Sequence, residues 1–173
     1  MNKARILVFI GLLISMEIIL TRFLSFQTPI VRVSFGFIPI ALCAMLFGPV
    51  AGGIAGAMSD IIGMMIFPKG AYFPGFTLSA LITGAVYGLF LYRNQKSIIR
   101  TILAVLVVTL VVDVGMNTLW LTMITSKAAS ALIVPRLIKG AIMFPAQVIL
   151  ITAVWKYAGS FIQANYFKDR VET

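Results

Sequence analysis

Three carboxylates interrupt apolar stretches that are long enough to cross a membrane: Glu17, Asp60 and Asp113. A charge at the centre of a bilayer costs on the order of 3 kcal/mol even on insertion scales, so such groups usually face a cavity or a partner. Asp113 also shares a helical face with Asn117, four residues later. Each carboxylate is a candidate for ligand binding, and the alternative for each is a buried ion pair that joins two helices.

Aromatic rings, rigid Pro and Gly backbone and single cations gather in three connections between apolar stretches, at 29–37, 67–76 and 135–140. This combination suits a flat aromatic ligand that carries anionic groups. The candidate rings are Tyr72, Phe76 and Trp120, and the candidate cations are Arg32, Lys69, Arg136 and Lys139. Tyr72 and Trp120 are also residue types that anchor helices at a membrane interface, so that interpretation stays open for both.

The composition requires that lipid surrounds most of the chain. The 173 residues are 61% hydrophobic and 11% charged, with a mean hydropathy of +1.06, whereas a soluble domain is roughly half apolar. Backbone polar groups in lipid must be paired internally, and the apolar stretches exceed the roughly ten residues of a barrel strand. The sequence therefore predicts an all-α integral membrane protein: a compact bundle of six transmembrane helices forming one domain, 1–173.

The expected spans are Ala4–Phe26, Phe35–Phe47, Val50–Phe67, Pro74–Tyr92, Ile98–Ile124 and Ile133–Tyr157. The second is short for a perpendicular crossing and contains Pro39, so we expect a kinked or partial helix packed inside the bundle. The first follows Lys3 and Arg5 as a signal peptide would, but it lacks a small-x-small cleavage site and contains Glu17. We therefore expect an uncleaved span.

Small residues recur on three of the expected helices. Two stripes have four-residue spacing: Gly52, Gly56 and Asp60 on the third span, and Ala80, Gly84 and Gly88 on the fourth. Such stripes allow neighbouring helix backbones to approach closely. We interpret these mainly as architecture. On the first span, Ala4, Gly11 and Ser15 lie on one face, which predicts docking of a partner's membrane helix, with internal packing as the alternative.

An even number of spans puts both termini on one side, together with the charged connection 93–100. We predict that this side is the cytoplasm. The cytoplasmic cations are then Lys3, Arg5, Arg93, Lys96, Arg100, Lys156, Lys168 and Arg170, and the outer ones are Arg22, Arg32, Lys69, Lys127, Arg136 and Lys139. This is a weak positive-inside bias. The outer cations therefore require a separate explanation.

Several functional classes lack their characteristic residues. Histidine is absent, Cys43 is the single cysteine, and no cluster has metal-ligand spacing. The sequence contains no phosphate-binding loop, no H-E-x-x-H motif and no G-x-S-x-G motif. We therefore predict no catalytic residues, no metal and no cofactor, and we do not expect this chain to hydrolyse ATP. If it moves a solute uphill, a partner has to supply the energy.

Three motifs carry a resemblance to a known family: Val31–Pro39, Gly70–Ala80 and Arg136–Lys139. Over essentially its full length, the sequence resembles the folate-specific substrate-binding subunit (S component) of energy-coupling factor (ECF) transporters. The resemblance implies a multi-pass protein of a prokaryotic cell membrane that captures folate from outside. It also implies a complex with a membrane-embedded coupling subunit (T component) and two cytosolic ATPase subunits. One departure is that Val8 follows Ala4 at i+4, which interrupts the small-residue docking motif.

The resemblance also suggests roles for the candidate residues. Folate has a flat pterin ring with a donor edge, an aminobenzoate spacer and a glutamate with two carboxylates. Asp60 is the first choice to accept from the pterin, and Asp113 with Asn117 is the second. Tyr72, Phe76 and Trp120 would stack on the rings, and Arg32, Lys69, Arg136 or Lys139 would meet the glutamate. The alternatives are an S component for another vitamin, a self-sufficient channel or carrier, and a non-transport protein that binds a protein partner.

Overall fold

The computed structural model describes residues 3–27, 32–68, 72–94, 96–125, 129–159 and 161–162. The elements in chain order are α1 (Lys3–Arg22), β1 (Ser25–Gln27), β2 (Arg32–Ser34), α2 (Phe37–Phe47), α3 (Pro49–Ile66), α4 (Pro74–Leu91), α5 (Ile98–Val107), the π-helical η1 (Val108–Met116), α6 (Asn117–Thr125), α7 (Ala129–Val154) and the π-helical η2 (Trp155–Gly159). Among the described residues, five helices are long and apolar enough to cross a membrane, and α2 is a shorter apolar helix. The predicted all-α membrane bundle is confirmed, and so is the short second helix.

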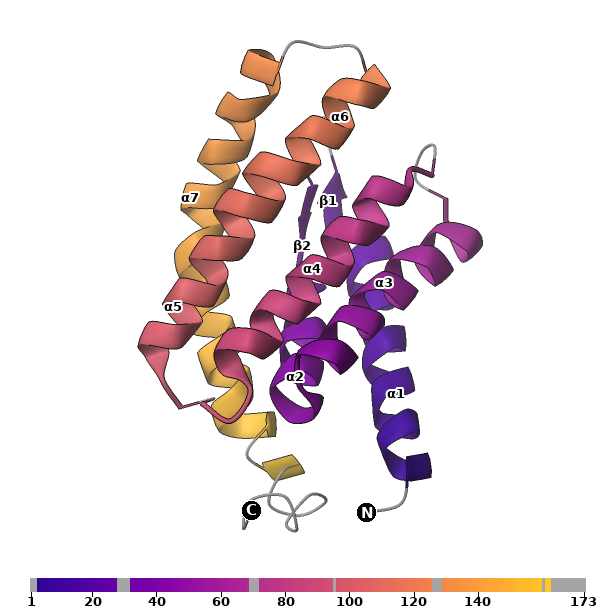
Figure 1. Ribbon diagram of the computed structural model, residues 1–173, viewed down its shortest axis with the longest axis vertical. Helices are drawn as coiled ribbons and strands as arrows, with labels where there is room; N and C mark the ends of the chain where they lie inside the picture. Colours follow the sequence, from indigo (N-terminus) through magenta and orange to yellow (C-terminus); the bar gives the residue numbers. More distant parts are fainter. Residues whose placement is uncertain are drawn as a thin grey trace.

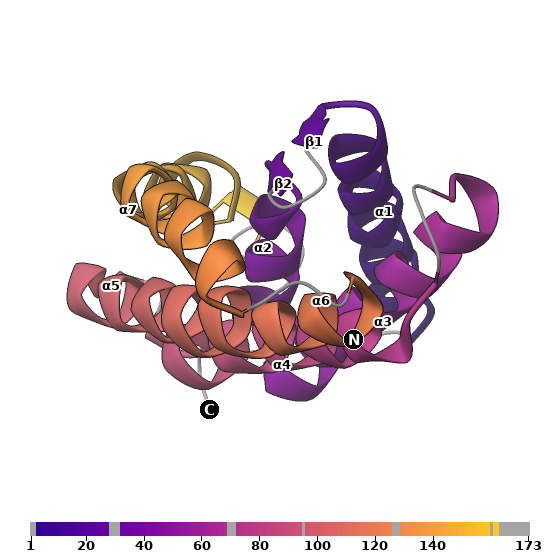
Figure 2. The same cartoon turned by 90° about the horizontal axis from the view of Figure 1, so that it is seen from above.

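The helices form two layers. Seen from above, α3, α4 and the continuous α5–η1–α6 helix lie in one layer, while α1, α2 and α7 lie in the other (Figure 2). The start of α1 and the end of η2 lie at one end of the molecule, together with the turn between α4 and α5 (Figure 1). The C-terminal ends of α1, α3 and α6 point toward the opposite end (Figure 1). The aromatic candidates Tyr72, Phe76 and Trp120, just before and at the start of α4 and on α6, therefore lie toward the end opposite the termini.

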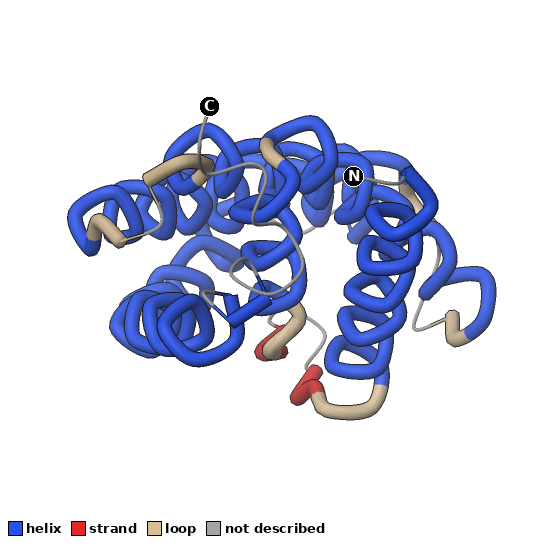
Figure 3. Tube along the Cα trace, turned by 90° about the horizontal axis from the view of Figure 1, so that it is seen from below, coloured by secondary structure: helices blue, strands red, loops and turns tan. Residues whose placement is uncertain are grey.

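The end of the first helix differs from the prediction. We expected one span from Ala4 to Phe26, but the helix ends at Arg22 and Ser25–Gln27 forms a strand. This strand pairs antiparallel with Arg32–Ser34, and Figure 3 shows the two short strands side by side. A short apolar run cannot be assigned to helix or strand from periodicity alone. Ser25–Gln27 therefore forms a strand because it pairs with Arg32–Ser34, which lies after the apolar run of the first helix.

The glycine stripes bring α3 and α4 together. A Cβ atom at Gly56 would collide with the carbonyl oxygen of Ala80, and one at Gly84 would collide with the carbonyl oxygen of Gly52. Backbones this close are possible only where no side chain intervenes. The predicted close approach of the third and fourth spans is confirmed.

The fifth span contains a wide turn that the sequence analysis did not anticipate. The backbone N–H of Asn117 bonds to the carbonyl of Val112, five residues earlier. In an α-helix the same donor would bond to the carbonyl of Asp113, four residues earlier. The wide turn therefore separates the Asp113 carbonyl from its usual helical donor.

Candidate ligand-binding site

Asp60 lies in the last two turns of α3 and contacts the first turn of α4. Thr77 Oγ1 donates a hydrogen bond of 2.8 Å to Asp60 Oδ2, and the hydroxyl groups of Thr77 and Tyr72 lie 3.1 Å apart. Asp60 Oδ1 accepts no hydrogen bond from the described residues. One carboxylate oxygen is therefore held by α4, and the other remains able to accept from a ligand.

Arg22, at the end of α1, is a member of this group that the sequence analysis treated only as an outer cation. Its side chain is buried, with the residue 6% exposed. Nη2 lies 4.0 Å from Asp60 Oδ1, and Nη1 lies 3.3 Å from both Met64 Sδ and the carbonyl oxygen of Phe67. Arg22 and Asp60 are 38 positions apart, so their spacing in the sequence does not predict that they pair. The sequence shows only that both are charged residues in apolar surroundings.

The predicted aromatic residues gather around the start of α4. Phe73 lies between two of them, with ring centroids 6.2 Å from Phe76 and 5.8 Å from Trp120. Trp120 Nε1 donates to Ser79 Oγ at 3.0 Å, which fixes the indole of α6 against α4. Tyr72 is half exposed at the same end of the helix. The structure brings the three predicted rings to one region and adds Phe73, which the sequence analysis did not single out.

Asp113 is the centre of a second polar group, which joins η1 to α7. Its Oδ2 lies 3.0 Å from Lys139 Nζ, and its Oδ1 accepts from Asn117 Nδ2 at 3.2 Å. Arg136 Nη1 donates at 2.8 Å to the Asp113 carbonyl, the group that the wide turn separates from its α-helical donor. Asp113 therefore forms a helix-to-helix ion pair, the alternative considered for each carboxylate, as Asp60 does with Arg22. Both carboxylate oxygens of Asp113 already have partners.

This second group retains hydrogen-bonding capacity. Asn117 Oδ1 and Arg136 Nε are buried and have no hydrogen-bond partner among the described residues. Buried polar groups are normally paired, so these atoms are able to accept from and donate to a ligand. Trp120 lies about one turn from Asn117 on α6, so this helix carries residues of both groups.

Three further predicted residues are placed as follows. Arg32 lies in β2, where the structure describes its backbone but not its side chain, and Lys69 lies outside the described residues. Glu17 is half-buried on α1, where a Cβ atom at Gly36 would lie 2.9 Å from its Oε1. Glu17 therefore packs α1 against the corner between β2 and α2.

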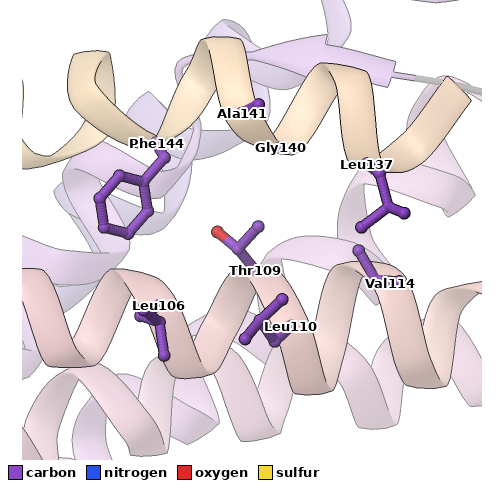
Figure 4. A pocket seen from close by; sticks show the side chains of 8 residues that line it. All are labelled: Leu106, Thr109, Leu110, Val114, Leu137, Gly140, Ala141 and Phe144. Atoms are coloured by element: carbon purple, nitrogen blue, oxygen red, sulfur yellow. The ribbon is translucent and has the colours of Figure 1, made fainter. Parts of the chain in front are cut away.

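An apolar crevice separates α5 and η1 from α7, adjacent to the Asp113 group (Figure 4). Its volume is about 240 Å³, and the lining residues are Leu106, Thr109, Leu110, Val114, Leu137, Gly140, Ala141 and Phe144. Sites for drug-sized ligands are usually about 300–1,000 Å³ with several placed polar groups. The crevice is too small and too apolar to recognise a large charged ligand by itself. Among the described residues, no group of three or more His, Cys, Asp or Glu side chains could hold a metal ion.

The small-residue face of α1 points away from the bundle. Ala4, Gly11 and Ser15 are exposed, and apart from the adjacent backbone of α1 no described atom lies within 4 Å of a Cβ placed on Gly11. Ser15 Oγ donates to the Gly11 carbonyl at 2.9 Å. The alternative that this face packs internally is wrong. Its use as a docking surface remains a prediction.

Two sequence relatives match most of the chain. Folate transporter FolT of Clostridium novyi (strain NT) is 53% identical over 156 residues, covering 90% of this chain and 91% of that protein. Folate transporter FolT of Leuconostoc mesenteroides subsp. mesenteroides is 37% identical over 147 residues, covering 82% of this chain and 79% of that protein. The similarity therefore extends across the whole helix bundle and is not confined to single motifs.

A solved structure and a family model agree with these relatives. A crystal structure of FolT bound with folic acid superposes with a TM-score of 0.79 at 42% identity, covering 84% of this chain and 88% of that chain. The family model described as "ECF-type riboflavin transporter, S component" matches residues 1–158. The chain therefore belongs to the family of S components of ECF-type transporters.

Proposed function

We propose that this chain is the folate-binding subunit of an ECF-type importer and forms one substrate-binding domain over residues 1–173. The observation that carries the proposal is the presence of two different polar groups at one end of the bundle. One is a carboxylate with an available oxygen among aromatic rings, and the other is rich in cations. Such a pair matches a ligand with a flat donor-bearing ring at one end and carboxylates at the other. The FolT relatives support the same assignment.

The pterin ring is assigned to the Asp60 group. Asp60 Oδ1 accepts no hydrogen bond from the described residues and lies 4.0 Å from Arg22 Nη2, whereas both carboxylate oxygens of Asp113 already accept hydrogen bonds. A carboxylate that accepts two N–H bonds from a ring edge forms a strong, directional contact. Tyr72, Phe76 and Trp120 supply the faces on which the rings stack. Asp113 with Asn117 stays the second choice for the pterin.

The glutamate is assigned to the cations of the second group. Arg136 and Lys139 are two cations against the single carboxylate of Asp113, so the group has an excess of positive charge. An arginine is well suited to bind a carboxylate because its donors are fixed in one plane. Arg32 and Lys69 are further candidates. This excess charge favours folate over riboflavin, the vitamin in the family description, because riboflavin carries no carboxylate.

The chain depends on partners for energy. We assign ATP hydrolysis to two cytosolic ATPase subunits, coupled through a membrane-embedded T component that docks on the Ala4, Gly11 and Ser15 face of α1. In this arrangement both termini are cytoplasmic and the two polar groups open to the outside. The exposed Gly11 surface supports this assignment.

The experiment that tests the proposal is direct ligand binding to the purified chain. Folate should bind saturably at submicromolar concentration, and riboflavin at the same concentration should not compete. Co-purification from membranes, with mass spectrometry of small molecules and proteins, should recover folate together with ATPase subunits. Saturable riboflavin binding without folate binding would identify an S component for another vitamin.

A further inference from the structure

Arg22 forms an ion pair with the Asp60 carboxylate without donating a hydrogen bond to it. The distance of 4.0 Å from Nη2 to Oδ1 is that of an ion pair, but it exceeds the length of an N–H···O hydrogen bond. Opposite charges at this distance attract each other without sharing a hydrogen bond. Because no donor among the described residues occupies Oδ1, the cation compensates the charge and leaves the acceptor available.

The guanidinium is also held in this position by residues at and just after the end of α3. Nη1 contacts the Phe67 carbonyl and Met64 Sδ, both at 3.3 Å. Gly63 provides the space, since a Cβ atom there would lie 2.8 Å from both Nε and Nη2. An anchored cation cannot move to close the gap to Asp60 without losing these contacts.

We propose that Arg22 is the positioning residue of the pterin subsite: it compensates the charge of the Asp60 carboxylate from 4.0 Å and leaves Oδ1 to accept the ligand's N–H donors. The proposal rests on the assignment of Asp60 to the pterin. Thr77 orients the other oxygen, so the carboxylate is fixed on one side and compensated on the other. Arg22 acts through Asp60 and makes no contact with the ligand in this role. The competing explanation is a tether, in which Arg22 only joins the end of α1 to the end of α3.

Two substitutions of Arg22 distinguish charge compensation of Asp60 from a purely structural tether between α1 and α3. Arg22→Lys keeps the positive charge but loses the planar guanidinium, whereas Arg22→Gln keeps an N–H donor but loses the charge. For charge compensation, folate affinity should fall about tenfold or more in Arg22→Gln and stay within about threefold in Arg22→Lys. Equal losses in both variants, or wild-type affinity in Arg22→Gln, would overturn the proposal.

Gly63→Ala provides a test that retains Arg22. The added methyl group meets the far end of a flexible side chain, so the guanidinium shifts while the backbone stays in place. Alanine is also the better helix former, which offsets part of the cost of displacing the buried guanidinium, so the variant should still fold. Folate affinity of the isolated chain should fall by about threefold or more, while Gly11→Ala, which meets open space on α1 away from both polar groups, should leave that affinity unchanged.

The controls separate this inference from the function on which it rests. Wild-type protein is titrated with folate first, and absence of binding would reject the folate assignment itself. If wild-type protein binds folate and folded Gly63→Ala binds it equally well, only the positioning role of Arg22 is rejected. Gly63→Ala also decides the question if Arg22→Gln does not yield folded protein.

Discussion

Lys139 Nζ on α7 lies 3.0 Å from Asp113 Oδ2 on η1, and this ion pair joins two helices at the level of the wide helical turn. Both side chains are mostly buried, with exposures of 18% and 27%. Asp113→Asn would leave Lys139 without its partner carboxylate, so thermal stability should fall by the equivalent of about 2 kcal/mol. Folate affinity should stay equal or increase, because the lysine becomes available to the glutamate. Isothermal titration alongside thermal unfolding in detergent measures both, and a large loss of affinity would instead make Asp113 the pterin acceptor.

Asp60→Asn is the matching substitution in the first group. The amide oxygen can still accept from the Thr77 hydroxyl, and the amide N–H donors then face the ligand. In the opposite orientation the ligand meets an amide oxygen, which is a weaker acceptor than a carboxylate. Folate affinity should fall about tenfold to a hundredfold, with a smaller effect on folding. Fluorescence titration of both aspartate variants provides the comparison. Unchanged affinity in Asp60→Asn would reject its role.

Arg136→Met tests the glutamate assignment. Arg136 also donates to the Asp113 carbonyl, so the substitution should lower the stability of the protein whichever ligand is present. The affinity for folate should nevertheless fall by about tenfold more than the affinity for pteroate, which lacks the glutamate. The ratio of the two dissociation constants is the measured quantity, and equal losses would refute a carboxylate contact.

Gly84→Ala tests the packing of α3 against α4. The new methyl group would overlap the backbone of Gly52, and backbone cannot move aside as a flexible side chain can. Overpacking of this kind costs about 1–3 kcal/mol, so the unfolding temperature in detergent should fall. Gly11→Ala is the control at an exposed helical glycine, and its unfolding temperature should match that of the wild type.

Gly11→Trp tests the proposed docking face. Gly11 lies outside the bundle, so an indole there should not disturb folate binding to the isolated chain. It should block close approach of a partner helix and abolish co-purification of the coupling and ATPase subunits. Unchanged recovery of those subunits would place the docking surface elsewhere.

The sequence by itself determined that lipid surrounds the chain, because apolar stretches of this length can satisfy their backbone groups in a bilayer only as helices. It also determined that Asp60 and Asp113 need partners, since isolated charges are costly at that depth. The glycine stripes at Gly56 and Gly84 correctly predicted the contact between α3 and α4, because the absence of side chains at fixed spacing is a local property of each helix.

Only the tertiary structure decided which charges meet. Asp113 pairs with Lys139, 26 positions away, and Arg22 faces Asp60 from another helix. The strand at Ser25–Gln27 and the wide turn before Asn117 likewise depend on interactions beyond the local pattern. Charge, hydropathy and spacing are properties of single segments, whereas partners are selected by how whole helices pack. For that reason the sequence could predict candidates for a binding site but not the contacts that hold them.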